Sequence, residues 1–135
     1  MNDKFQELLK EFKKLDLPNR EYAIYGSGPI VVRGLRETGD LDVIVTESLY
    51  KKLAKKYGED EKYQKGRRIK IGNIEIYAVA YWEAETEKLA QALQNAEKIN
   101  GLRYVALTDL IDLKKKMGRE KDLKDIKLIK GFLKR

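Results

Sequence analysis

The sequence predicts an α/β (α+β) protein with one mixed β-sheet, helices mainly on one face of that sheet, and a short pair of helices at the C-terminus. Segments with apolar residues at helical spacing interleave with short apolar segments that show strand-like patterns. A length of 135 residues suits a single domain around one core, without internal repeats or low-complexity linkers. We therefore expect one domain over 1–135, with the sheet core in 1–106 and the C-terminal helices in 107–135.

The first half of the chain predicts three helices and two strands. Phe5, Leu8 and Phe12 recur at helical spacing, and Pro29 suits the first turn of a helix, where its missing N–H is not needed. Gly58 is a typical helix terminator. Helices are thus expected at 3–15, 29–36 and 47–58, and strands at 21–25 and 40–46.

The second half continues the alternation. A tight turn at Gly72-Asn73 joins two strands, Thr108 is a candidate helix cap, and Gly118 ends the helix that follows. Strands are expected at 67–71, 74–80 and 102–107, and helices at 85–99, 109–117 and 121–133.

The composition excludes several kinds of chemistry. The chain has no cysteine, so disulfides, thiolate zinc sites and cysteine nucleophiles are absent. It also has no histidine, which excludes Ser-His-Asp catalysis and histidine-ligated metals. A reaction in this protein must therefore use carboxylates, lysine, arginine, tyrosine or a carboxylate-bound metal.

The net charge of +7 is concentrated at the C-terminus. Residues 113–135 contain ten Lys or Arg against three Asp or Glu, and the preceding residues balance. This segment suggests a phosphate-bearing partner such as a nucleotide or RNA, or else only a solvated helix face. No targeting segment or apolar run of membrane-spanning length is present, so a cytoplasmic protein without membrane contact is expected.

Two carboxylates stand beside an apolar run in the stretch GSGPIVVRGLRETGDLDVIV, residues 26–45. Residues two apart on a strand share a face, so Asp40 and Asp42 project together, opposite Leu41 and Val43. Burying ionised carboxylates without a partner is costly. The expected partner is a hard divalent cation such as Mg²⁺, although aspartates at a strand start can also be simple turn residues.

A Gly-Ser turn precedes the carboxylates. Gly26 allows the backbone to approach a ligand closely, and Ser27 offers a hydroxyl to phosphate oxygens. Twelve residues separate Ser27 from Asp40. The Gly-Lys-Ser/Thr ending of a Walker loop is absent.

G-S, twelve residues and then D-L-D-V resembles the nucleotidyltransferase superfamily of the DNA polymerase β type, in particular its small prokaryotic members. The later stretch LTDLIDLKKKMGREKDLKDI is similar to a second block of aminoglycoside and abortive-infection nucleotidyltransferases. The two blocks cover 21–46 and 107–126, about a third of the chain.

This resemblance implies transfer of a nucleoside monophosphate from ATP, or another nucleoside triphosphate, to an acceptor, with two Mg²⁺ ions. It implies Asp40, Asp42 and Glu75 as catalytic, metal-binding residues, with Glu75 standing where Asp is commoner. An exposed edge-strand glutamate is the alternative for Glu75. The residues it implies for nucleotide binding are Gly26, Ser27, Arg33, Lys114, Arg119 and Asp122.

Alternatives remain for these residues and for the whole chain. Lys114, Arg119 and Asp122 can be solvated helix residues, and Arg33 and Arg36 can pair with Glu37. The related enzymes carry a larger helical domain that holds the acceptor. Either a second subunit or a partner protein presents the acceptor here, or catalysis has been lost. The alternative function is a non-catalytic nucleotide- or RNA-binding module, or a toxin–antitoxin component, on the same fold.

Overall fold

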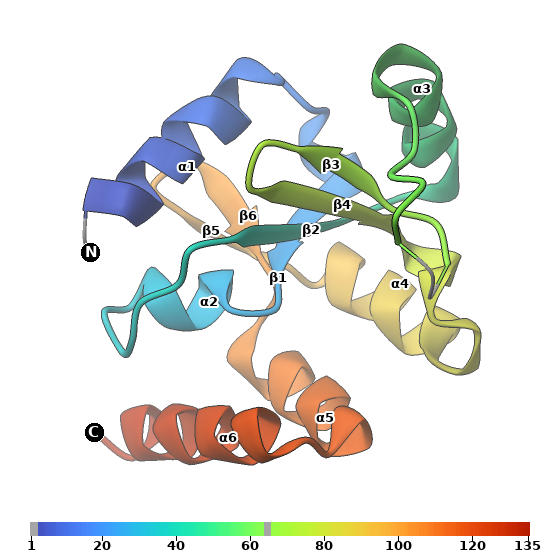
Figure 1. Cartoon of the computed structure of the whole chain (residues 1–135). Helices are drawn as coiled ribbons and strands as arrows, with labels where there is room; N and C mark the ends of the chain where they lie inside the picture. Colours follow the sequence, from blue (N-terminus) through green and yellow to red (C-terminus); the bar gives the residue numbers. More distant parts are fainter. Residues whose placement is uncertain (1–2, 64–65) are drawn as a thin grey trace.

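A computed structural model describes residues 3–63 and 66–135 of the chain, and within them a six-stranded mixed sheet runs in the order β3-β4-β2-β1-β6-β5 (Figure 1). The predicted fold class is therefore confirmed. The strands are β1 (Tyr22–Tyr25), β2 (Leu41–Val45), β3 (Ile69–Ile71), β4 (Ile74–Ala78), β5 (Glu97–Ile99) and β6 (Leu102–Tyr104).

The centre of the sheet brings together strands that are distant in sequence. β1 is antiparallel to β2, while β2 is parallel to β4 and β1 is parallel to β6. Two antiparallel hairpins, β3-β4 and β5-β6, form the edges. The N-terminal end of β2 consequently lies beside the C-terminal end of β1 and the N-terminal end of β4.

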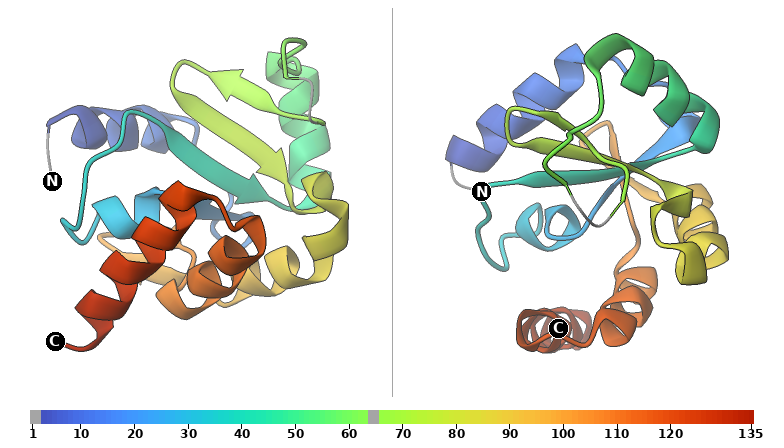
Figure 2. Two further views of the ribbon diagram at one scale, coloured as in Figure 1. Left: turned by 60° about the horizontal axis from the view of Figure 1, so that its bottom comes forward. Right: turned by 45° about the vertical axis from the view of Figure 1, so that its right-hand side comes forward.

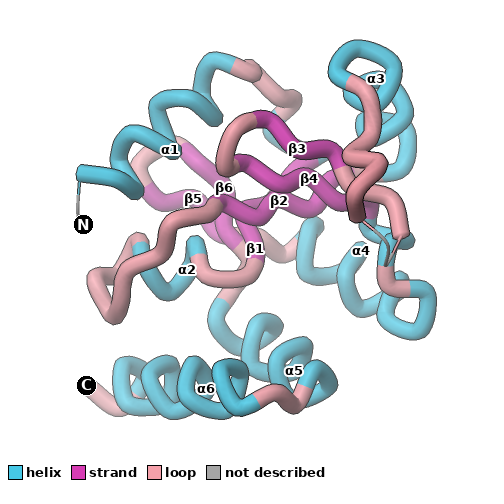
Figure 3. The backbone as a smooth tube through the Cα atoms, viewed as in Figure 1, coloured by secondary structure: helices cyan, strands magenta, loops and turns pink. Residues whose placement is uncertain are grey.

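Helices cover both faces of this sheet, rather than mainly one face as the sequence suggested. One face packs against α1 and α3, and the other packs against α4 and the α5–α6 pair (Figures 1 and 3). Both faces are covered because β2 is apolar on both: Val43 and Val45 join one core cluster and Ile44 joins the other. The helices are α1 (Asp3–Lys14), α2 (Gly28–Val31), α3 (Glu47–Tyr57), α4 (Thr86–Gln94), α5 (Leu107–Met117) and α6 (Glu120–Leu133).

Local sequence explains several helix ends. Thr46 caps α3 by accepting a hydrogen bond from the Leu49 N–H, and Gly58 follows its end with φ +79°. Gly118 ends α5 with φ +63°, as predicted, and the chain turns directly into α6. Both views of Figure 2 show α5 and α6 as neighbours, and the two helices pack against each other.

Several predicted elements differ from the structure. The helix expected at 29–36 is limited to α2, because Gly34 takes φ +75° and its N–H bonds back to the Val31 carbonyl. The strand expected at 74–80 ends at Ala78, where a 3₁₀ turn follows. Thr108 is not the cap of α5; it lies in the first turn, and Ala106 takes the N-cap position without a side-chain bond.

The helix expected at 85–99 is also too long. It ends as α4 at Gln94, and 97–99 form strand β5 instead. Asn100 and Gly101 both adopt positive φ values, +51° and +84°, which suit a two-residue hairpin turn to β6. This turn outweighs the helical spacing of Ala96 and Ile99. In the part of the chain that the structure describes, no helix is long and apolar enough to cross a membrane.

Candidate functional site

Asp42 and Glu75 lie next to each other at the centre of the sheet. They are register partners in the parallel pair of β2 and β4. Leu41 and Val43, which flank Asp42, pack into the core on the other face, as do Ile74 and Ile76, which flank Glu75. Strand alternation therefore turns both carboxylates toward the face that carries the α5–α6 pair.

A cleft of about 560 Å³ lies between this face and α5–α6. Asp40, an exposed residue directly before β2, joins Asp42 and Glu75 in the lining. Of the nine predicted site residues, the structure brings eight to this cleft: Gly26, Ser27, Asp40, Asp42, Glu75, Lys114, Arg119 and Asp122.

Arg33 lies outside the lining of the cleft. Its guanidinium donates to the Pro29 carbonyl at 2.7 Å and pairs with Glu97 on the edge strand at 3.0 Å. The ring of Phe132 lies 5.9 Å from the guanidinium carbon. These contacts join α2, β5 and α6, so the structure gives Arg33 a packing role away from the carboxylates.

The carboxylates form an electrostatically strained group. Burial, followed by the negative charges of Glu75 and Asp40, raises the pKa of Asp42 to about 7. Lys114 and Arg68 act in the opposite direction but do not outweigh these effects. An added cation would therefore stabilise the ionised form of Asp42.

Glu75 has a cationic partner in the protein. Arg68 Nη1 donates to Glu75 Oε1 at 3.0 Å, and the same guanidinium also pairs with Asp60. The guanidinium carbon lies 4.2 Å from the ring centroid of Tyr63, which holds Arg68 over an aromatic face. Sequence reasoning did not identify Arg68 as part of the site.

The residues present suit a divalent cation in composition, though not in their present side-chain positions. Among the described residues, no group of three or more acidic side chains is arranged as a ready metal site. Asp40 and Asp42 nevertheless provide hard oxygen ligands beside an open cleft, and burial together with the charges of Glu75 and Asp40 raises the pKa of Asp42. Glu75 would complete the set once Arg68 releases its oxygen.

The Gly-Ser turn lies against these carboxylates. Gly26 has φ +65°, and a Cβ atom built there would lie 2.6 Å from Asp42 Oδ2. Ser27 Oγ accepts a hydrogen bond from Arg36 Nη2 at 2.8 Å, so its hydroxyl already has a partner. Arg36 thus pairs with Ser27 and with Asp125 of α6, rather than with the Glu37 side chain.

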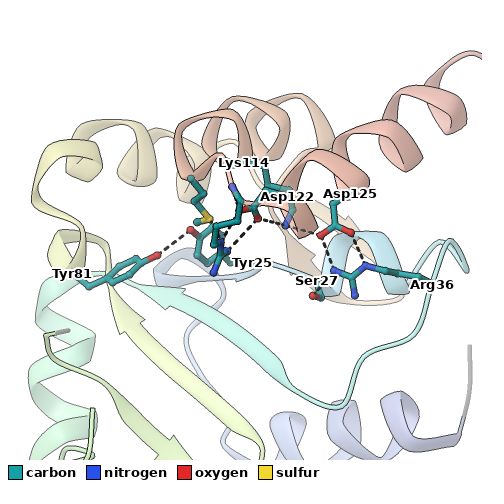
Figure 4. Close-up of polar contacts among 9 residues, drawn as sticks. Tyr25, Ser27, Arg36, Tyr81, Lys114, Asp122 and Asp125 are labelled. Atoms are coloured by element: carbon teal, nitrogen blue, oxygen red, sulfur yellow. Dashed lines mark hydrogen bonds and ion pairs between the residues drawn. The ribbon is translucent and has the colours of Figure 1, made fainter. Parts of the chain in front are cut away.

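A chain of charged contacts connects this turn to the C-terminal helices (Figure 4). Arg36 binds Asp125 through two hydrogen bonds of 2.7 Å. Lys114 lies 2.9 Å from Asp125 and 3.5 Å from Asp122, and Arg119 binds Asp122 through two hydrogen bonds of 2.7 and 3.2 Å. We call these five residues the charge network: Arg36, Lys114, Arg119, Asp122 and Asp125.

The network keeps its two aspartates ionised. Burial alone would raise the pKa of Asp122, but hydrogen bonds from Arg119 and the charge of Lys114 hold it below the usual value. Asp125 follows the same pattern, with Arg36 and Lys114 outweighing burial and lowering its pKa. The cations of the network are therefore already committed to internal partners.

Lys121 completes the basic side of the cleft. It is exposed, lies in the lining, and is the one lining cation that forms no ion pair within the described residues. It belongs to the second quoted block, but it was not among the predicted site residues.

Aromatic residues form the rest of the cleft and were also missed. Tyr77 follows Glu75 by two positions on β4, so strand alternation could have placed it on the same face. The aromatic lining residues are Tyr25, Tyr63, Tyr77, Tyr81 and Trp82.

Comparison of the chain with protein-family models, with curated proteins and with solved structures finds no match.

Proposed function

We propose that the protein is a metal-dependent nucleotidyltransferase that moves a nucleoside monophosphate from a triphosphate, with ATP as the expected donor, to a hydroxyl or phosphate acceptor. The observation that carries this proposal is the register of Asp42 and Glu75 on neighbouring strands, with Asp40 beside them, facing a cleft whose other side is basic. Adjacent carboxylates opposite cations are suited to a metal-bound polyphosphate.

Each residue has a defined part in the proposal. Asp40 and Asp42 would hold Mg²⁺, and Glu75 would complete the site after leaving Arg68. Bound Mg²⁺ supplies charge stabilisation for the attacking and leaving oxygens at the α-phosphorus. Glu75 would then accept the acceptor's proton at its freed oxygen.

The basic side of the cleft would hold the phosphates. Lys121 forms no ion pair with any of the described residues, so its ammonium group is available to the terminal phosphates. Gly26 leaves room for the close approach of a phosphate, and Ser27 is held by Arg36 beside that position. Lys114 and Arg119 would contribute positive potential from within the charge network rather than as free ligands.

The acceptor needs a further surface. We propose that a second copy of the chain or a partner protein supplies that surface.

A decisive experiment is nucleotidyl transfer with labelled nucleoside triphosphates, Mg²⁺ and a cell lysate as the source of acceptors. We expect label in one acceptor class and release of pyrophosphate. The double variant Asp40→Asn, Asp42→Asn should lose Mg²⁺-dependent nucleotide binding and lower transfer by orders of magnitude. Unchanged nucleotide binding by this folded variant would exclude the proposal.

One observation favours a second candidate, a nucleotide- or RNA-binding module without transfer activity. The ion pair between Arg68 and Glu75 occupies the third carboxylate. The exposed lysines of α6 would then contact a polyanion, and RNA affinity should fall steeply with salt. Nucleotide binding without pyrophosphate release, together with that salt dependence, would support the module.

A further inference from the structure

The proposed transfer chemistry leaves one wall of the cleft without a role. Tyr63, Tyr77, Tyr81 and Trp82 line this wall, and all four are only partly buried. We call them the aromatic wall. Such rings are costly to leave exposed to water, so a cluster of them inside a polar cleft indicates a planar or apolar ligand.

The rings hold one another in place. The ring centroids of Tyr77 and Tyr81 lie 4.7 Å apart, and those of Tyr63 and Tyr77 lie 5.9 Å apart. The Tyr81 hydroxyl lies 3.0 Å from that of buried Tyr25, within hydrogen-bond distance. The wall is thus organised before a ligand arrives, which lowers the entropic cost of binding.

The wall is also uncharged. Burial raises the pKa of Tyr81 above the usual value for tyrosine, so its hydroxyl stays neutral at physiological pH. The Tyr81 hydroxyl is already engaged with Tyr25. Apart from the face of Tyr63 that the Arg68 guanidinium covers, the wall therefore offers ring faces more than free hydrogen-bonding groups.

The order of the strands in the sheet sets the spatial order of the groups that line the cleft. Ser27 follows β1, Asp42 lies on β2, and Glu75 and Tyr77 lie on β4, and these strands are neighbours in that order. Figure 4 shows Ser27 and Arg36 at one end of the contacts and Tyr81 at the other. Phosphate-binding groups, carboxylates and rings thus follow the order of terminal phosphates, α-phosphate and base in a nucleoside triphosphate.

We propose that the aromatic wall binds the nucleobase of the donor by stacking and selects purines over pyrimidines by ring area. This inference rests on the proposed function and adds a base-binding subsite to it. Base–ring stacking tolerates different bases because every base has a π-face. Adenine and guanine should therefore both be accepted, and cytosine and uracil should bind more weakly.

The protein contains its own reporter for this subsite. Trp82 is the single tryptophan of the chain and belongs to the wall. Its fluorescence is titrated with ATP, CTP and inorganic tripolyphosphate, each with Mg²⁺. We expect strong quenching and the tightest binding with ATP, weaker binding with CTP, and binding without comparable quenching for tripolyphosphate.

Removal of a ring should weaken base binding specifically. Tyr77→Leu is expected to lower ATP affinity about fivefold or more, in the range of single stacking contacts, and to leave tripolyphosphate affinity unchanged. Tyr63→Leu is the second variant if Tyr77→Leu folds poorly. Tyr57→Leu is the matched control, because Tyr57 is an exposed ring at the end of α3 outside this cleft.

The outcomes separate the subsite from the proposed function. Equal affinities for ATP, CTP and tripolyphosphate, or an ATP affinity that both wall variants leave unchanged, would overturn the subsite alone. A wall variant that raises only the acceptor KM would assign the rings to the acceptor and also overturn it. Quenching by adenosine with no Mg²⁺-dependent triphosphate binding would retain the subsite and reject the transferase.

Discussion

Gly26 lies directly against the carboxylate of Asp42. A Cβ atom at Gly26 would come within 2.6 Å of Asp42 Oδ2, and the backbone there has φ +65°. The contact follows from the sheet, because Tyr25, the residue before Gly26, is the antiparallel register partner of Asp42. The Gly-Ser turn and the carboxylates therefore form one structural unit.

Gly26→Ala should damage both stability and binding. The left-handed backbone costs a non-glycine residue about 1 kcal/mol or more, and the new methyl group must displace the Asp42 carboxylate. We expect a lower melting temperature and loss of Mg²⁺-dependent nucleotide binding, measured by thermal unfolding and by titration.

Gly34→Ala provides the matched control. Gly34 has a similar φ of +75°, but a Cβ atom there would meet nothing within 4 Å. Gly34→Ala should therefore lose stability through backbone strain alone and keep nucleotide binding. Equal binding by both variants would show that the contact between Gly26 and Asp42 has no part in the site.

Asp42 should make the metal-free protein less stable as the pH rises. Its pKa is raised from 3.8 to about 7, so between these values the folded state binds more protons than the unfolded state. The contribution of Asp42 to the free energy of unfolding is therefore fully present below about pH 4, and it is lost as the pH rises through 7. Removal of the ionisable group should remove this loss.

Asp42→Asn should accordingly raise the melting temperature at pH 8 and have little effect at pH 4. The gain is on the order of a few kcal/mol, since one pKa unit corresponds to about 1.4 kcal/mol. The measurement is thermal unfolding at both pH values in a chelating buffer. Asp16→Asn, at an exposed position, is the control, and a pH-independent gap between wild type and Asp42→Asn would contradict the prediction.

The sequence predicted the local part of the site well. Asp40 and Asp42 are two positions apart, and Glu75 alternates with Ile74 and Ile76. Because successive side chains of a strand point to opposite faces, the common face of the three carboxylates could be predicted. The turn at Gly26 and Ser27, which lies at the same cleft, could also be recognised in the sequence because it stands between two apolar segments. These features depend on neighbours within a few residues.

Contacts between distant segments could not be predicted in the same way. Arg36 and Asp125 are 89 positions apart, and only the packing of α6 against the 26–36 segment pairs them. Arg68 reaches Glu75 because β3 and β4 form a hairpin. At 97–99, apolar spacing was compatible with a helix, and the Asn100-Gly101 turn selected a strand.

The charge network should be essential for attachment of the C-terminal helices. Asp125 has a side chain only 6% exposed and binds both Arg36 and Lys114. Asp125→Ala leaves buried Lys114 with only its longer contact of 3.5 Å to Asp122, and it leaves the partly exposed Arg36 without a carboxylate partner. Loss of one partner of a buried ion pair typically destabilises by about 3–5 kcal/mol, and we expect a value at the low end of this range. Chemical denaturation should report this loss.

An exposed ion pair of the same helix is the control for that loss. Lys124 and Glu120 lie 3.8 Å apart, and both side chains are largely exposed. Glu120→Gln should change the free energy of unfolding by less than about 1 kcal/mol. Similar effects of the two variants would mean that the network is not a buried, stabilising unit.

Arg68 should compete with a divalent cation for Glu75. Arg68 Nη1 lies 3.0 Å from Glu75 Oε1, and its charge also helps to lower the pKa of Asp42. Arg68→Met frees the glutamate oxygen and leaves the three carboxylates more negative, so Mg²⁺ or Mn²⁺ should bind several-fold more tightly. The same repulsion should lower the melting temperature of the metal-free protein and make its stabilisation by the ion larger.

Arg67→Met tests whether this effect belongs to the site. Arg67 is the adjacent residue, but it pairs with Glu47 and Glu59 instead of the cleft carboxylates. Arg67→Met should leave cation affinity unchanged. The affinities of both variants are measured by calorimetric titration and compared with that of the wild type. If Arg68→Met instead weakens cation binding, the guanidinium must position Glu75 for the ion rather than compete with it. If neither variant alters cation binding, Glu75 does not belong to a metal site, and the carboxylate set reduces to Asp40 and Asp42.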